Sequence, residues 1–363
     1  MSQKMKSRAE LSFVHLDDYL PDIVDRLASF EAAVEQRPDG FAFDYPYGTA
    51  FLGTGHGRLA MELTSANMDG LQRVRELVTV AVQIYAKAEN PEIVWEGDLT
   101  GDGSLATFRK MQVICVDEVT PRMRRIRLEG DNLARYGEFG GLHLRLLFPT
   151  PENPDPVWPV AGPNGLALWP DVERRPVARV YTIRRLDVQA GWMDIDFVVH
   201  GEQDGCEGVG SAWATAARPG NEIGIIGPVG RPVREADWYV LGCDETGLPA
   251  ASRILERMAP GARGMAFIEV ADKSERQEIS RPEGVALTWI YRDGVPAGED
   301  RKLVDAVARV EWPSDLTTFG WFAAEAEPAR GLRDYWRNTL SVGRERSLVA
   351  GYWRRGASGV MAG

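Results

Sequence analysis

The segment Arg179-Val-Tyr-Thr-Ile-Arg184 brings two cations, an aromatic ring and a hydroxyl group together in one short stretch. In an extended strand, Arg179 and Tyr181 would share one face, with Thr182 and Arg184 on the other face or toward the backbone edge. A flavin needs such groups: an arginine for a phosphate, an aromatic ring for the isoalloxazine, and a hydroxyl or backbone amide for N5. A solvated strand with a cross-strand ion pair would produce the same pattern.

A second segment begins at His200 and carries closely spaced glycines just before a short predicted helix; its candidate residues are His200, Gly208, Gly210, Ser211, Ala212 and Trp213. Glycine lets the backbone N–H groups approach a pyrophosphate, and the helix N-terminus favours negative charge. An ordinary glycine turn with Ser211 as N-cap explains the segment equally well. Taken alone, His200 fits a structural histidine better than a proton carrier.

A third segment, Leu241-Gly-Cys-Asp-Glu-Thr-Gly-Leu-Pro-Ala250, passes from an apolar strand through a polar turn into a helix. In doubly wound sheets, this kind of turn is where a cofactor phosphate or nicotinamide lies, which makes Asp244 and Thr246 candidates. The segment lacks G-x-G-x-x-G, the usual dinucleotide fingerprint. An earlier glycine-rich turn, Gly224 to Arg231, suits the end of a barrel.

The composition is that of an ordinary globular protein, with 363 residues, 44% hydrophobic and 26% charged. A net charge of -11 argues against nucleic acid as the main partner. The sequence has no C-x-x-C pair among its three cysteines and no H-E-x-x-H, so we expect no metal site. Without an apolar segment long enough for a membrane span or a signal peptide, the chain is predicted to be cytoplasmic.

Three domains are predicted, over residues 1–97, 107–235 and 236–363. The first shows two amphipathic helices (16–33 and 67–88) around short strands (40–45, 48–53 and 59–63), with a closing strand at 92–95. The second is rich in strands and poor in helices, which favours an antiparallel barrel. The third alternates strand and helix, which is typical of a parallel nucleotide-binding sheet. A Pro/Trp-rich connection, 151–176, is either an insertion over the active site or a disordered loop.

The order of these segments resembles the siderophore-interacting protein family, a branch of the ferredoxin–NADP reductase-like flavoproteins. The resemblance covers about residues 108–355. It depends on R-V-Y-T-I-R, D-F-V-V-H-G with G-V-G-S-A-W-A, P-G-N-E-I-G-I-I-G-P-V-G, D-E-T-G-L-P-A and the tail Tyr352-Trp-Arg354. It implies a six-stranded antiparallel β-barrel for FAD and a C-terminal Rossmann-like α/β domain for NADPH or NADH, after a small α+β N-terminal domain.

Carried over residue by residue, the resemblance assigns the flavin to Arg179, Tyr181, Thr182 and Arg184. The phosphates and adenine side would lie near His200, Gly208, Gly210, Ser211, Ala212 and Trp213, and Asp244 and Thr246 would line the nicotinamide or flavin edge. The chain departs from the family at Val209-Gly210, where Pro-Ala is usual, and at Ala212, where a bulky basic residue is common.

The resulting hypothesis is an NAD(P)H-dependent ferric-siderophore reductase, a cytoplasmic monomer in which reduced FAD passes electrons to Fe(III). Fe(II) binds anionic oxygen ligands more weakly, so reduction releases the iron. A reduced ferredoxin is an alternative donor. A siderophore-binding protein without turnover and a general NAD(P)H:flavin or quinone reductase remain as alternatives.

Many ferric siderophores are anionic, so basic residues are expected at the flavin face. The candidates are Arg145, Arg231 and Arg354, although each also fits an ordinary surface arginine. No catalytic acid or base is assigned. The N-terminal segment resembles domain of unknown function 2218, through Phe-Asp-Tyr-Pro-Tyr-Gly and Ile-Val-Trp-Glu, and a packing or regulatory role is expected for it.

Overall fold

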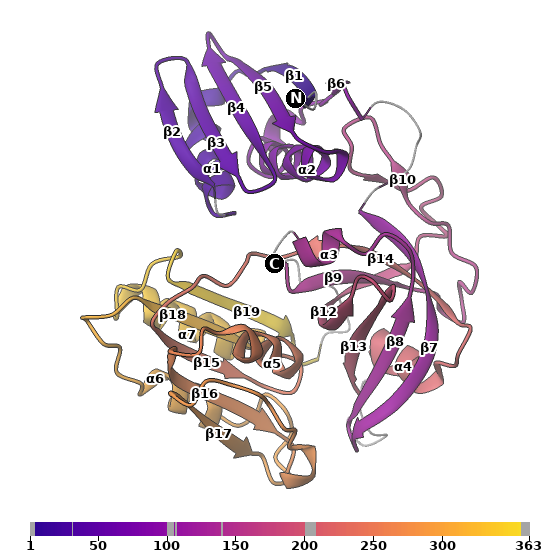
Figure 1. The fold of residues 1–363 in the computed structure, drawn as a ribbon, viewed down its shortest axis with the longest axis vertical. Coiled ribbons are helices and arrows are strands. Elements are labelled where there is room, and N and C mark those ends of the chain that lie inside the picture. The colour runs from indigo at the N-terminus through magenta and orange to yellow at the C-terminus, as the bar shows by residue number, and fades with distance from the viewer. Residues whose placement is uncertain are drawn as a thin grey trace. The chain divides into compact units, whose positions relative to one another are not determined.

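The computed structural model describes residues 4–30, 32–99, 105, 107–138, 141–199 and 208–356 (Figure 1). Contacts between residues divide the chain into two compact units. The first unit comprises Met1–Arg109, Arg135–Gly141 and Asn153–Pro176, and the second comprises Lys110–Ala134, Leu142–Glu152 and Val177–Gly363. The division into three domains with the boundaries expected from sequence stays a prediction.

The first unit is built on an antiparallel six-stranded sheet in the order β2-β3-β4-β5-β1-β6. Ile23 and Val78, from its two long helices, are fully buried against sheet residues such as Leu52 and Met61. Its elements are β1 (Met5–Ser12), α1 (Leu16–Ala28), β2 (Ala33–Arg37), β3 (Gly40–Tyr45), β4 (Gly48–Gly55), β5 (Arg58–Ser65), α2 (Met68–Tyr85), a 3-10 helix (Lys87–Glu89), β6 (Glu96–Gly97), α3 (Arg135–Glu138), β10 (Val160–Ala161) and β11 (Ala167–Leu168).

Two strands of this sheet escaped the sequence prediction, and one predicted strand is wrong. In β1, the inward positions are Ser7, Ala9 and Leu11, so small and polar residues hide the alternation that marks a strand. All five residues of β2 are exposed, and such an edge strand leaves no apolar pattern. The predicted closing strand at 92–95 is irregular, and the pairing with β1 is made by β6 instead.

The Pro/Trp-rich connection belongs to the first unit. Its strands β10 and β11 pair as a small antiparallel ribbon. The Trp158 ring lies 5.6 Å from that of Phe108, and the Thr79 hydroxyl of α2 donates to the carbonyl oxygen of Asn164 at 3.4 Å. Of the two alternatives for this segment, the disordered loop is wrong, because apolar and polar contacts with the N-terminal fold order it. A position over the active site stays a prediction.

The second unit begins with a closed antiparallel barrel in the order β12-β13-β8-β7-β14-β9. Buried Asp194 and Asp196 of β13 each accept a two-pronged ion pair, from Arg127 and Arg125 of β8, which are their partners in the strand register. The barrel elements are β7 (Phe108–Thr120), β8 (Met123–Glu129), β9 (His143–Phe148), β12 (Val177–Asp187), β13 (Trp192–Val198), α4 (Val209–Ala216) and β14 (Glu222–Val229).

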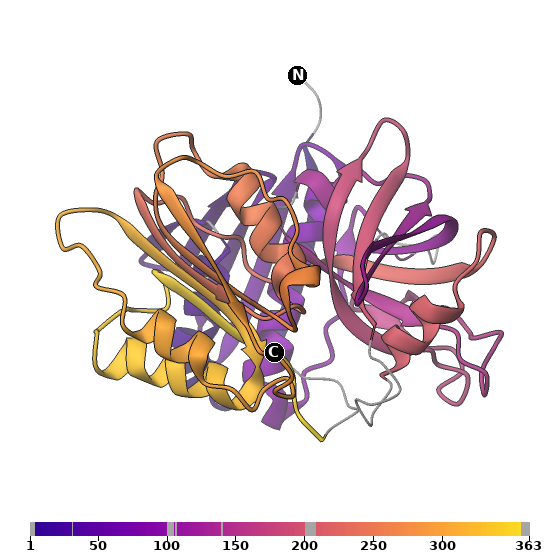
Figure 2. The ribbon, with the colours of Figure 1, turned by 90° about the horizontal axis from the view of Figure 1, so that it is seen from below.

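The remaining elements form a parallel five-stranded sheet in the order β17-β16-β15-β18-β19. Helix α5 covers one face and helices α6 and α7 cover the other, as the opposite positions of α5 and the yellow α7 in Figure 2 show. The elements are β15 (Trp238–Cys243), α5 (Leu248–Arg257), β16 (Arg263–Val270), a 3-10 helix (Lys273–Glu275), β17 (Val285–Tyr291), α6 (Lys302–Ala308), β18 (Thr318–Glu325), α7 (Ala326–Asn338) and β19 (Ser347–Trp353).

The barrel and the parallel sheet share one hydrophobic core, because Met123 and Leu142 of the barrel segments pack with the α5 face of the sheet. Glu275 adds a polar connection: its carboxylate accepts from the Thr120 hydroxyl at 2.5 Å and from the Arg122 amide at 3.0 Å. The predicted fold class is confirmed: an α+β N-terminal part, a six-stranded antiparallel barrel and a parallel α/β sheet.

Candidate cofactor site

Strand β12 places Tyr181 in a cluster of aromatic rings. The Tyr181 ring centroid lies 4.5 Å from that of Phe197 and 6.0 Å from that of Phe148. Trp213 of α4 completes the cluster, at 5.7 Å from Phe197 and 5.6 Å from Phe148. The structure therefore brings the predicted residues Tyr181 and Trp213 together through two rings that sequence analysis did not select.

Both missed rings carry a sequence signal. Phe148 continues the inward alternation of Leu144 and Leu146 along β9, so the strand period alone places it inside the barrel. Phe197 lies in the motif D-F-V-V-H-G, within a strand that is buried on both of its faces. Neither phenylalanine bears a polar or ionisable group, which is why they were not among the candidate residues predicted from sequence.

The Tyr181 hydroxyl lies against the backbone of Gly210. A Cβ atom at Gly210 would fall 1.9 Å from Tyr181 Oη, whereas a Cβ at Gly208 would meet nothing within 4 Å. Burial raises the pKa of Tyr181, although Arg179 opposes the shift, so the phenol keeps its proton. Its hydroxyl makes no hydrogen bond within the described part of the chain, and it is therefore available to a ligand.

The N-terminus of helix α4 lies next to this phenol. Its N-cap is Gly208, which offers no side chain to the first amides. Its last turn is satisfied by cations: Arg124 donates to the carbonyl oxygens of Ala214 and Thr215, and Arg218 donates just beyond them. The N-terminus of α4, which carries the positive end of the helix dipole, is therefore suited to an anion.

The remaining predicted residues of this segment are distributed as follows. Ser211 is buried in the first turn of α4, followed by Ala212. His200 lies outside the described residues. Arg179 is half-buried and donates to the carbonyl oxygen of Ala178 at 2.8 Å. Buried Thr182 contacts His143 of β9, with 3.2 Å between Oγ1 and Nδ1.

This set fits a flavin dinucleotide. The exposed edge of an aromatic cluster suits the isoalloxazine, a protonated phenol and the Thr182 hydroxyl supply hydrogen bonds, and a glycine-led helix N-terminus suits the pyrophosphate. The Gly210 backbone approaches Tyr181 so closely that a side chain at this position would require the Tyr181 ring to shift. Assignment of individual residues to atoms of FAD stays a prediction.

Arg184, by contrast, already forms an ion pair within the protein. Its guanidinium donates to both carboxylate oxygens of Glu256 on α5, at 2.8 and 2.6 Å, and lies 4.0 Å from Asp196. The side chain is only 4% exposed. In this structure Arg184 connects β12 to α5, and its predicted role in flavin binding stays untested.

Asp244 is likewise enclosed, at the carboxyl end of β15. Its Oδ1 accepts from the amide of Thr246 at 2.9 Å and from the Thr246 hydroxyl at 2.6 Å. Its Oδ2 accepts from the indole N–H of Trp353 at 2.7 Å. Burial and the neighbouring Glu245 raise the pKa of Asp244 to about 6. The two predicted residues Asp244 and Thr246 therefore come together, with the C-terminal tail folded onto them.

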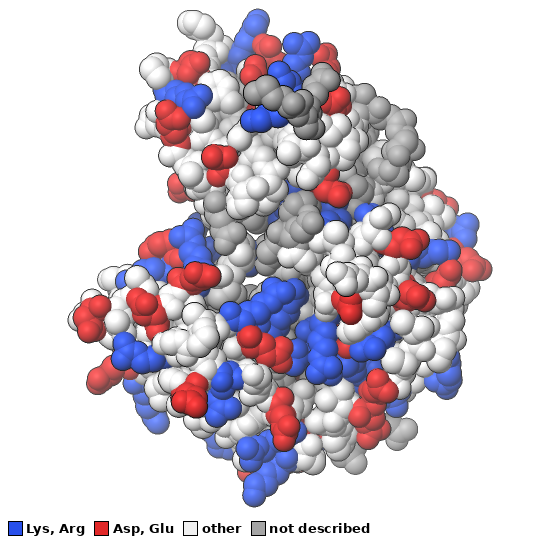
Figure 3. Space-filling model, in the orientation of Figure 1, with Lys and Arg blue, Asp and Glu red and all other residues white. Residues whose placement is uncertain are grey.

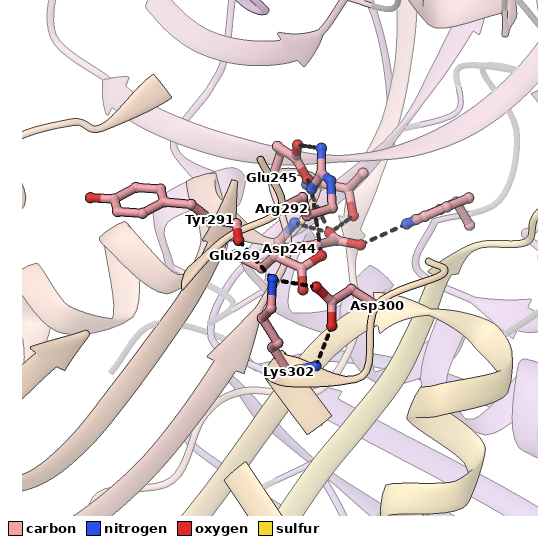
Figure 4. A network of polar contacts seen from close by, with 10 residues as sticks. Asp244, Glu245, Glu269, Tyr291, Arg292, Asp300 and Lys302 are labelled. Atoms are coloured by element: carbon pink, nitrogen blue, oxygen red, sulfur yellow. Dashed lines mark hydrogen bonds and ion pairs between the residues drawn. The ribbon is translucent and has the colours of Figure 1, made fainter. Parts of the chain in front are cut away.

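A buried ion network lies beside Asp244 at the same edge of the sheet (Figure 4). Arg292, just after β17, donates through both terminal nitrogens to Glu245 and approaches Glu269 at 3.5 Å. Burial raises the pKa of Glu269 to about 7, against the opposing effect of Arg292. Sequence analysis missed this network, because its members come from the ends of three strands and share no motif.

An open hollow of about 550 Å³ flanks the network, lined by Thr288, Trp289, Tyr291, Lys302, Asp305 and Arg309 among others. Lys302 is held at its rim by Asp300 at 2.7 Å and by the carbonyl oxygen of Tyr291 at 3.3 Å. Carboxyl ends of parallel strands are where nucleotide ligands bind in such sheets.

Among the described residues, no three His, Cys, Asp or Glu side chains are grouped closely enough to hold a metal ion. Cys243 is a buried free thiol and Cys115 is a half-buried one, while Cys206 lies outside the described part. The candidate site therefore consists of aromatic rings, hydrogen-bond donors and paired charges.

Two family models match the chain: the siderophore-interacting FAD-binding domain over residues 112–232 and the siderophore-interacting protein domain over residues 236–356. Ferric vibriobactin reductase of Vibrio cholerae is 34% identical over 242 residues, which is 66% of this chain and 86% of the relative. The chain belongs to the siderophore-interacting protein family.

Other relatives agree with this membership. The NADPH-dependent ferric-chelate reductase of Escherichia coli is 31% identical over 255 residues, covering 68% of this chain and 92% of that protein. A siderophore utilization protein from T. fusca has a crystal structure that matches with a TM-score of 0.61 and 37% identity, over 69% of this chain and 94% of the other. Both family models begin after residue 111, so the likeness of the N-terminal part to domain 2218 stays a prediction.

The three arginines proposed for the substrate of this siderophore-interacting protein differ in their surroundings. Arg145 on β9 and Arg354 after β19 are exposed, and neither makes a hydrogen bond or ion pair within the described chain. Arg231 is half-buried and donates to the carbonyl oxygen of Arg344 at 3.4 Å. Arg145 and Arg354 are therefore the candidates whose charge the protein leaves open.

Basic and acidic side chains alternate over the face shown in Figure 3, and no single sign of charge covers it. None of the described helices has the length and apolarity that crossing a bilayer requires.

Proposed function

We propose that the chain is an NAD(P)H-dependent ferric-siderophore reductase that uses FAD. The observation that supports this most directly is the close packing of Tyr181 on Gly210 at the glycine-capped N-terminus of α4, inside the segment that matches an FAD-binding domain. Relatives named as ferric-siderophore and ferric-chelate reductases at 31–34% identity support the reaction.

The chemistry that bound FAD supplies is conversion of a two-electron hydride donor into one-electron transfers to Fe(III). The aromatic cluster around Tyr181 would hold the isoalloxazine in place and exclude water from one side. The amides of α4 and the Arg179 guanidinium would balance the charge of the pyrophosphate. Thr182 would hydrogen-bond N5.

The nicotinamide donor would approach from the carboxyl edge of the parallel sheet, near Asp244 and Thr246. NADPH and NADH both fit this proposal, and the naming of the Escherichia coli relative favours NADPH. Both carboxylate oxygens of Asp244 already accept hydrogen bonds, from Thr246 and from Trp353. Asp244 would therefore shape the site rather than bind the nucleotide directly. Ferredoxin stays as an alternative donor.

The substrate would be an anionic ferric siderophore, attracted by Arg145 and Arg354. Reduction would release the iron from the siderophore, because Fe(II) carries less charge than Fe(III) and binds hard oxygen ligands more weakly. We further propose a cytoplasmic monomer, with a packing or regulatory role for the N-terminal part.

An anaerobic titration tests the proposal. The visible spectrum of the purified protein is recorded, NADPH or NADH is added, and a ferric siderophore follows with a ferrous-iron trap. Flavin bands that bleach with the nucleotide and return as ferrous iron is trapped are the expected result. A protein that is colourless and binds no added FAD would overturn the proposal.

The same titration separates the alternatives. A flavin that stays oxidised while the siderophore binds would indicate a binding protein without turnover. Simple quinones reduced faster than ferric siderophores at equal concentration would indicate a general quinone reductase.

A further inference from the structure

A row of three hydrogen-bonded side chains runs from strand β12 of the barrel into the parallel sheet. Thr182 of β12 contacts Nδ1 of His143 on β9 at 3.2 Å, and Nε2 of His143 contacts the Tyr352 hydroxyl on β19 at 2.9 Å. The His143 and Tyr352 rings meet edge to face, with centroids 5.5 Å apart. The row thus joins a residue next to Tyr181 to the C-terminal tail.

The surroundings of His143 keep its ring neutral. Burial and the nearby Arg253 guanidinium lower the pKa of His143 to about 4. Arg253 is itself fixed, because it donates to the carbonyl oxygen of Ile183 at 2.9 Å. The row therefore contains a neutral imidazole, which carries one N–H and one acceptor nitrogen.

The Tyr352 hydroxyl decides which nitrogen carries the proton. Burial raises the pKa of Tyr352, with further contributions from Cys243 and Asp244, so the phenol stays protonated. Within the described chain its only hydrogen-bond partner is Nε2 of His143. A phenol that did not donate there would leave a buried donor unsatisfied, which is unfavourable. Tyr352 therefore donates to Nε2, and Nδ1 carries the proton.

This arrangement fixes the direction of the last hydrogen bond. Nδ1–H donates to the Thr182 oxygen, so the proton of the Thr182 hydroxyl is left for a third partner. We propose that His143 and Tyr352 are positioning residues that make the Thr182 hydroxyl a donor toward N5 of the oxidised flavin, an inference that rests on the proposed function. A donor at N5 stabilises the oxidised flavin, in which N5 accepts a hydrogen bond, and this bond is lost when N5 gains a hydrogen on reduction.

The test combines the reduction potential of bound FAD with a double-mutant cycle. Tyr352→Phe removes the donor to Nε2, so either imidazole tautomer becomes available and Thr182 loses its fixed direction. The Thr182 oxygen can then accept from N5–H of the reduced flavin, so we expect the equilibrium constant for two-electron reduction, measured against a reference dye, to rise about three- to tenfold, or about 15–30 mV. Tyr239→Phe is the matched control, since it removes a tyrosine hydroxyl at the opposite end of the same sheet, on β15, which β18 separates from β19.

In a Thr182→Val background, the effect of Tyr352→Phe on the potential should disappear, whereas a general loss of packing would persist there. An independent readout is the ¹⁵N spectrum of the histidine rings at pH 7 without FAD, assigned with His143→Gln. It should show His143 protonated on Nδ1 in the unsubstituted protein and a mixture of tautomers in Tyr352→Phe.

The outcomes separate the two proposals. If FAD binds and Tyr352→Phe leaves the potential unchanged, or if His143 is protonated on Nε2, the inference is overturned while the reductase function stands. If no FAD binds, the proposed function fails, and this inference fails with it.

Discussion

The barrel side and the sheet side of the candidate site differ in how far the protein satisfies its own polar groups. On the barrel side, the Tyr181 phenol makes no hydrogen bond within the described chain, and the N-cap of α4 is Gly208, which has no side chain to cap the helix. On the sheet side, both oxygens of Asp244 and the carboxylate of Glu245 are bonded within the protein. We call the barrel side open, because polar groups without a partner in the protein are suited to a ligand. We call the sheet side closed, because its polar groups bond to one another and maintain the scaffold. This contrast can be tested by substitutions that affect either stability or ligand affinity.

The largest effect is expected from Arg184→Ala, on the closed side. It removes a cation that is only 4% exposed and leaves Glu256 without its two-pronged partner. Because Glu256 is partly exposed, we expect a loss of about 2–4 kcal/mol in the free energy of unfolding, measured by urea denaturation. Arg185→Ala, at the exposed neighbouring position, should change stability little. Equal stability of the two variants would contradict a scaffold role for Arg184.

A second effect concerns Glu269, whose pKa is raised to about 7 from an ordinary 4.5. Between these pH values the native state binds more protons than the unfolded state, so this group lowers stability as pH rises. Glu269→Gln should reduce the loss of unfolding free energy between pH 4.5 and pH 8 by about 1–3 kcal/mol. The comparison is urea denaturation at both pH values.

Glu278→Gln serves as the control for that experiment, because it removes an exposed carboxylate from the following segment. The same pH dependence in Glu269→Gln and in the unsubstituted protein would show that the buried network does not titrate as described.

On the open side, Gly210→Ala should weaken FAD binding. The new Cβ would lie 1.9 Å from Tyr181 Oη unless the ring moves. Because this chain has a glycine where alanine is usual in the family, we expect the Kd for FAD to rise about three- to tenfold as the ring is displaced, measured by quenching of flavin fluorescence. Gly208→Ala introduces the same methyl group where nothing lies within 4 Å, and should bind FAD much more tightly than Gly210→Ala. Equal affinity for FAD in both variants would remove Tyr181 from the proposed flavin site.

The smallest effect is expected from Arg145→Ala. An exposed arginine without a partner contributes at most about 1 kcal/mol to attraction of an anion, so the apparent KM for an anionic ferric siderophore should rise about two- to fivefold at low salt. The difference should shrink at high salt. An unchanged KM at low salt would remove Arg145 from the substrate surface.

Much of the fold and part of the site followed from sequence. The family resemblance is confirmed, and the pairs Tyr181 with Trp213 and Asp244 with Thr246 do come together. Periodicity predicted the strands with apolar inward faces and failed for β1, where two of the three inward residues, Ser7 and Ala9, are small or polar. A motif also does not show whether its polar side chains already have partners within the protein. In R-V-Y-T-I-R, Arg184 pairs with Glu256 and Thr182 contacts His143. Neither contact could be predicted, because both partners come from elements distant in the sequence.

The shared core of the barrel and the parallel sheet has a consequence for truncation. A chain ended after residue 235 would expose Met123 and Leu142 to water and remove the Glu275 carboxylate from Thr120 and Arg122. The two segments that separate family models match are thus one body for folding. Gene fusions and expression fragments should keep them together.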